Sequence, residues 1–175
     1  MSVRTIQILK IMHILAWVTF VGLLIQAGSI LVSYVISYFQ PEAAQDLYQG
    51  LDLYNLRKFS FWHYTSTVSF MFAISGMKAF AAFLVIKVLR TIKLANPFQK
   101  EVVRLLERIS YLLIGTWAIS IFYKEHSSWL MKVVGPFQEN WGNTGEFIFV
   151  AGIVFIFSQI FKRGVEMQSE NELTI

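Results

Sequence analysis

The chain has 175 residues, of which 55% are apolar and only 15% are charged, and it contains no cysteine. A typical soluble domain has about a quarter of its residues charged, so this composition excludes a disordered chain and argues against a water-soluble domain. Without cysteine, this chain alone cannot form a disulfide, a cysteine-ligated zinc site or an iron–sulfur cluster.

A first membrane-spanning helix is predicted over residues 11–39. The window from Ile11 to Pro41 has no charged residue, and it exceeds the roughly 20 residues that a bilayer core requires. A cleaved signal peptide would have an apolar region of only about 7–15 residues. Because the apolar run continues through Tyr38, we expect a retained membrane anchor.

Three further apolar segments predict an all-α, four-helix transmembrane bundle that forms a single integral membrane domain. They cover residues 59–86, 105–123 and 146–161. The last is the shortest, so it would need its flanking residues and local thinning of the bilayer to cross. The segment 59–86 contains Lys78, the one charge expected well inside a span. Such a charge is a candidate for function, although snorkelling of its long stem would also explain it.

The distribution of Lys and Arg predicts the orientation of these helices. If both termini lie on one side of the membrane, that side carries ten Lys and Arg residues and the opposite side carries four. Cytoplasmic segments of membrane proteins are enriched in these residues. We therefore expect both termini, the loop 87–104 and the tail 162–175 to be cytoplasmic.

A helix start is predicted in this basic loop, at Asn96-Pro97-Phe98. Asn96 would be the N-cap and Pro97 the first helical residue, with Gln99 completing a loose capping box. A short amphipathic helix would then run over residues 98–108 and lead directly into the third span. We expect anionic lipid or a partner protein to cover this helix.

The three histidines do not predict a metal or haem site. His13 and His63 are expected near opposite faces of the membrane, so they cannot hold one haem between them. His63 and His126 share a face, with Glu125 beside His126, but their spacing is not typical of zinc ligands. No catalytic, metal-binding or cofactor-binding set is predicted on either side, so we do not expect an enzyme.

The sequence contains two motifs. The first begins before the third span and reads LANPFQKEVVRLLERISYLLIG. The second is the C-terminal segment, which starts at Gly164 and ends in Asn171-Glu172-Leu173-Thr174-Ile175. Together they resemble a bacterial four-helix membrane family classed as domain of unknown function twenty-nine seventy-five. The match at Leu106-Glu107-Arg108-Ile109 is approximate. The resemblance implies a protein of the bacterial inner membrane. Because such proteins are often encoded beside a small helix-turn-helix regulator, it also implies a membrane partner of a transcription factor, with no established activity.

We therefore expect a non-enzymatic, regulatory or signalling protein that lies in the lipid bilayer and binds a cytosolic protein, such as a helix-turn-helix regulator. The expected partner-binding residues lie in the two motifs: Asn96, Pro97, Phe98, Glu101, Arg104, Arg108, Glu172, Leu173, Thr174 and Ile175. Direct nucleic-acid binding is not expected, since membrane orientation alone explains six basic residues over 87–108. The alternative is a small transport or immunity-type protein acting on a peptide or lipid, which would need Lys78.

Overall fold

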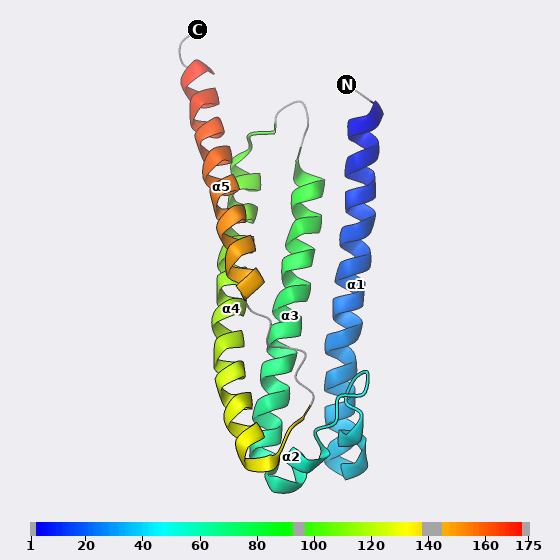
Figure 1. Cartoon of the computed structure of the whole chain (residues 1–175). Coiled ribbons are helices and arrows are strands. Elements are labelled where there is room, and N and C mark those ends of the chain that lie inside the picture. The colour runs from blue at the N-terminus through cyan, green and yellow to red at the C-terminus, as the bar shows by residue number, and fades with distance from the viewer. Residues whose placement is uncertain (1–2, 93–96, 138–144, 173–175) are drawn as a thin grey trace.

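The computed structural model describes residues 3–92, 97–137 and 145–172, and every regular element in these ranges is a helix. The elements in chain order are α1 (Val3–Phe39), the 3-10 helix η1 (Pro41–Gln45), α2 (Tyr54–Phe59), α3 (Phe61–Thr91), α4 (Lys100–Val134) and α5 (Gly145–Glu172) (Figure 1). The predicted all-α class is confirmed.

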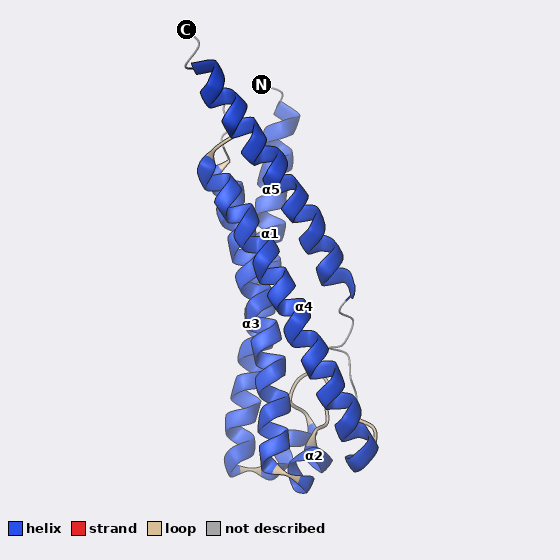
Figure 2. Ribbon diagram, turned by 90° about the vertical axis from the view of Figure 1, so that its left-hand side faces the viewer, coloured by secondary structure: helices blue, strands red, loops and turns tan. Residues whose placement is uncertain are grey.

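The four long helices stand side by side in the order α1, α3, α4, α5, because each packs against the next one along the chain (Figure 1). Among the described elements, α1 packs against α3 and η1 alone, and α5 packs along α4 (Figure 2). Both chain ends, the end of α3 and the start of α4 lie together at what we call the terminal end. The opposite end, with η1 and α2, is the loop end.

All four long helices are long and apolar enough to cross a membrane. Their outer faces carry large apolar side chains, including Val18, Ile25 and Phe149, which are 65%, 60% and 70% exposed. Contiguous apolar surface of this extent is unfavourable in water but is solvated by acyl chains in a bilayer. The predicted bundle of four transmembrane helices is confirmed, and the chain is a multi-pass membrane protein.

The segment between α1 and α3 folds back onto the loop end of the bundle. Leu47, Leu53 and Leu56 are each only 1% exposed and belong to one apolar cluster with Tyr64 and Tyr123. Burial of these side chains stabilises the connection. Hydroxyl groups also join the helices there, since Ser37 Oγ and Tyr64 OH lie 2.8 Å apart across the α1–α3 interface.

The helices extend beyond the predicted spans. Residues 87–91 end α3 and residues 100–104 begin α4, so both ends of the predicted loop 87–104 are helical. Residues 124–134, which follow the predicted third span, continue α4 as far as Val134, and Ser127 and Leu130 are buried in the bundle there. The predicted tail 162–175 continues α5 to Glu172.

The last long helix, α5, begins beside the middle of α4 and not at the loop end (Figures 1 and 2). Ser110 Oγ donates a hydrogen bond of 2.9 Å to the carbonyl oxygen of Ala151, which fixes the register of the two helices. Phe161 lies against Phe98, just before α4. The uncharged part of α5 therefore runs beside the charged first turns of α4.

Candidate functional site

The ring of Phe98 fastens the segment before α4 to α5. Its centroid lies 5.5 Å from that of Phe161, in an edge-to-face arrangement that aromatic pairs favour. The same ring covers Gly164 so closely that a Cβ added there would lie 2.6 Å from Cε1 and 2.7 Å from Cγ of Phe98. Two motif residues that are far apart in the sequence are thus in contact.

The predicted helix start at Asn96-Pro97 is wrong. The helix begins at Lys100, and Gln99 occupies the N-cap position with an extended backbone (φ −117°, ψ 137°) and no capping hydrogen bond from its side chain. Pro97 and Phe98 therefore precede the helix, and Asn96 lies outside the described residues. Docking of Phe98 on α5 holds this segment away from the helical path that the local sequence favours.

The apolar face of the first turns of α4 is covered by protein. Val102 is 0% exposed, and Leu105 and Ile109 belong to a buried cluster that includes Leu84 of α3 and Ala151 of α5. The expectation that lipid or a partner covers this face is therefore wrong.

One opening at the terminal end is a groove between α4 and α5, with a volume of about 290 Å³. Two valines contribute apolar surface, Val103 being buried and Val165 half-buried. Charged residues of both signs surround them, and the complete lining is Lys100, Val103, Arg104, Glu107, Lys162, Val165 and Glu166. We call this feature the α4–α5 groove.

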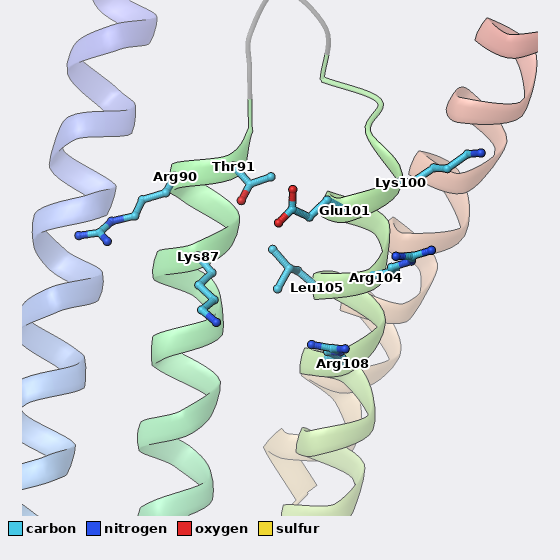
Figure 3. Close-up of a pocket in the computed structure, with 8 residues that line it drawn as sticks. All are labelled: Lys87, Arg90, Thr91, Lys100, Glu101, Arg104, Leu105 and Arg108. Atoms are coloured by element: carbon cyan, nitrogen blue, oxygen red, sulfur yellow. The ribbon is translucent and has the colours of Figure 1, made fainter.

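A second opening, the α3–α4 pocket, lies between the end of α3 and the start of α4 and has a volume of about 710 Å³. Its lining consists of Lys87, Arg90, Thr91, Lys100, Glu101, Arg104, Leu105 and Arg108. Figure 3 shows Thr91 and Glu101 directed toward each other across the gap, with Lys87 and Arg108 at a lower level. Arg90 is turned toward α1, where its guanidinium carbon lies 5.7 Å from the ring centroid of Trp17.

The α3–α4 pocket has a large excess of positive charge. Five of its lining residues are Lys or Arg, and Glu101 is the one carboxylate among them. Within the described ranges none of these five cations forms an ion pair; the pair found there joins Arg163 and Glu166 at 3.1 Å. A concave surface with uncompensated charge of one sign concentrates ions of the opposite sign.

The structure brings part of the predicted partner-binding set together. Glu101 and Arg108 line the α3–α4 pocket, and Arg104 borders both openings. Phe98 lies nearby, with its ring packed against Gly164 of α5, and Pro97 precedes Phe98 in the chain. Glu172 is the last residue of α5, while Leu173, Thr174 and Ile175 lie outside the described residues.

Lys78 contacts the start of α5. Its Nζ lies 5.0 Å from the ring centroid of Phe147, and Glu146 interacts with it electrostatically. Glu146 is in the first turn of α5, where the helix dipole also favours a carboxylate. Through these contacts Lys78 links α3 to the first turn of α5, which otherwise packs along α4.

Two histidines lie together near the loop end, in an aromatic cluster. The ring centroids of His63 and His126 are 5.8 Å apart, and His63 lies 5.3 Å from Trp129. In the part of the chain that the structure describes, no three His, Cys, Asp or Glu residues come together as metal ligands. Ring packing accounts for the position of both histidines.

Sequence reasoning missed the roles of Glu146, Gly164 and Lys87. Glu146 directly precedes the fourth apolar stretch, so a search for a partner of Lys78 could have found it. Gly164 lies in a motif of the sequence, but only the position of the Phe98 ring shows why a residue without a side chain is required there. Lys87 falls within the predicted loop 87–104, so the sequence does not indicate that it lines a pocket against α4 from the last turns of α3.

Comparison with known proteins gives one match. A family model described as "Protein of unknown function (DUF2975)" matches residues 52–175. The matched region includes α3, α4 and α5, and with them both openings and the Phe98–Gly164 contact. No match was found among curated proteins or among solved structures.

Proposed function

The chain belongs to the DUF2975 family of proteins of unknown function, and we propose that it is a non-enzymatic regulatory membrane protein. In this proposal it binds a cytosolic protein through the α4–α5 groove. The gene context implied by the family resemblance suggests a small helix-turn-helix regulator as that partner.

The proposal places the protein in the bacterial inner membrane with its terminal end in the cytoplasm. The charge distribution supports this, because ten Lys and Arg residues belong to that side and four to the other. In this orientation the α4–α5 groove is open to cytosolic proteins. The last turns of α5, from Lys162 onward, then extend into the cytosol.

The observation that carries the proposal is the mixed character of the α4–α5 groove. Val103 and Val165 provide apolar surface, while three cations and two carboxylates form the rest of the lining. Protein interfaces combine an apolar centre with a polar rim in this way. A volume of about 290 Å³ is at the lower limit of small-molecule pockets, so it suits one or two anchoring side chains of a partner helix.

The contacts of α5 suggest how binding could be regulated. Its start is held by Lys78, and its last turns are held by Phe98 at Gly164. A change in the bilayer or at the loop end that loosens the first contact would shift α5 along α4. Because the groove lies between these two helices, such a shift would alter its shape and release or capture the partner.

Site-specific photo-crosslinking in cells tests this proposal. A photo-reactive amino acid in place of Glu107, inside the groove, is expected to crosslink the regulator encoded beside the gene. The same reagent in place of Tyr111, which is 61% exposed one turn further along α4, serves as the control. Equal crosslinking of the regulator from both positions, or crosslinking from neither, would contradict the proposal.

A further inference from the structure

The α3–α4 pocket is a different space from the α4–α5 groove and requires its own explanation. Membrane orientation accounts for cations at this end of the chain, but it does not require them to surround one pocket. Here residues of two helices, Lys87 from α3 and Arg108 from α4, line the same space of about 710 Å³. That volume lies well within the range of ligand-binding pockets, about 300–1,000 Å³.

The chemistry of the lining favours an anion. Lys87 and Arg108 are exposed and therefore accessible, and within the described residues neither has an acidic partner. The Thr91 side chain lies at a higher level of the pocket, opposite Glu101 (Figure 3). Glu101 opposes binding of an anion, since its carboxylate faces the same gap.

The surroundings of the pocket are those of a lipid headgroup region. Arg90 lies over Trp17 of α1, and the neighbouring Val18 is 65% exposed. On the other side, the uncharged stretch of α5 continues to Phe161, beside Phe98. The charges of the pocket thus lie at a height where both outer helices still present apolar side chains. Basic pockets between transmembrane helices at this level recognise anionic lipid headgroups.

We propose that the α3–α4 pocket binds a phosphate group, with Lys87 and Arg108 as its cationic contacts. The apolar flanks favour the phosphodiester of an anionic phospholipid, whose acyl chains would lie along α1 or α5. A soluble phosphate ester has the same chemistry and is the second possible source. This site extends the proposed function, because it gives the protein a ligand besides its cytosolic partner.

Native mass spectrometry of the full chain, purified in detergent, tests the site. The titrated ligands are phosphatidylglycerol, zwitterionic phosphatidylethanolamine and glycerol 3-phosphate. Phosphatidylglycerol is expected to bind at least tenfold more tightly than phosphatidylethanolamine. Binding of glycerol 3-phosphate at similar affinity would identify the phosphate itself as the determinant, and its absence would identify the lipid as the ligand. Failure of both anionic ligands to bind would overturn the proposal.

Variants localise the binding to the pocket. Lys87→Gln combined with Arg108→Gln is expected to weaken anion binding at least tenfold, while Lys87→Arg with Arg108→Lys retains it. Lys124→Gln, which removes an exposed cation near the loop end of α4, is the matched control and should bind normally. An equal loss in the Lys124→Gln protein, or no loss in the double variant, would contradict the assignment.

A gain-of-affinity variant keeps the test independent of folding defects. Glu101→Gln removes the one carboxylate that lines the pocket, so it is expected to tighten anion binding severalfold. A structural role for this exposed residue predicts no such gain. Unchanged or weaker binding by a Glu101→Gln protein of normal size-exclusion profile would overturn the proposal, even if the double variant failed to fold.

Discussion

The ring of Phe98 lies directly over the backbone of Gly164, leaving no space for a side chain at that position. This contact joins the segment before α4 to the last turns of α5. It also explains why the helix begins at Lys100 and not at Pro97. The α4–α5 groove, whose lining includes Lys100 and Val165, lies beside this contact.

Gly164→Ala is expected to displace Phe98 and destabilise the protein. The added methyl group would overlap the ring, and overpacking of this kind costs about 1–3 kcal/mol. Thermal unfolding in detergent, followed by circular dichroism, measures the effect. Phe98→Ala in the Gly164→Ala background removes the overlap, so the double variant should unfold at a higher temperature than Gly164→Ala. A double variant that is no more stable than Gly164→Ala would contradict the packing described above.

Lys78 and Glu146 are expected to act as a pair. Either Lys78→Met or Glu146→Gln alone removes their attraction. When one substitution is already present, the other should therefore lower the stability of the protein by less than it does in the wild-type background. Because Glu146 is exposed, we expect a coupling energy of only about 0.5–1 kcal/mol. A double-mutant cycle measured by thermal unfolding tests this, and strictly additive effects would show that the two charges do not interact.

A buried pair of hydroxyl groups joins α1 and α3. Removing both hydroxyls is expected to destabilise the protein less than removing only one of them. Ser37→Ala leaves the buried Tyr64 hydroxyl without its 2.8 Å partner, and an unsatisfied buried group costs about 1–3 kcal/mol. Tyr64→Phe in the Ser37→Ala background removes that group as well. The double variant should therefore recover stability in a chemical unfolding assay; no recovery would argue against the pairing.

Cysteine labelling tests the proposed orientation. Because the chain has no cysteine of its own, only the introduced residue in this protein can react with the reagent. Lys100→Cys lies at the terminal end and Lys124→Cys near the loop end of the same helix. In intact cells, a membrane-impermeant maleimide is expected to label Lys124→Cys and to label Lys100→Cys only after lysis. The reverse pattern would place the termini outside the cytoplasm.

The sequence predicted four membrane-spanning helices and the class of fold because both depend on long apolar runs, although the fourth run, 146–161, is shorter than a bilayer core. It did not predict helix ends, since these depend on tertiary contacts: Phe98 on α5 delays the start of α4, and Leu130 in the core extends α4 beyond the last apolar run. Arg104 and Arg108 were found from their motif. Lys87 faces them from α3, and only the packing of the helices places it there.

The most direct test of the proposed function compares two arginine substitutions on α5. Val165→Arg places a charge in the α4–α5 groove, whereas Met167→Arg changes a side chain that is 49% exposed on the opposite face of the helix. The full-length variants would be tested for binding of the proposed helix-turn-helix regulator in purified form. We predict that Val165→Arg weakens this binding at least tenfold and that Met167→Arg leaves it unchanged. Equal binding by both variants and the wild-type protein would contradict the assignment of the groove as the partner site.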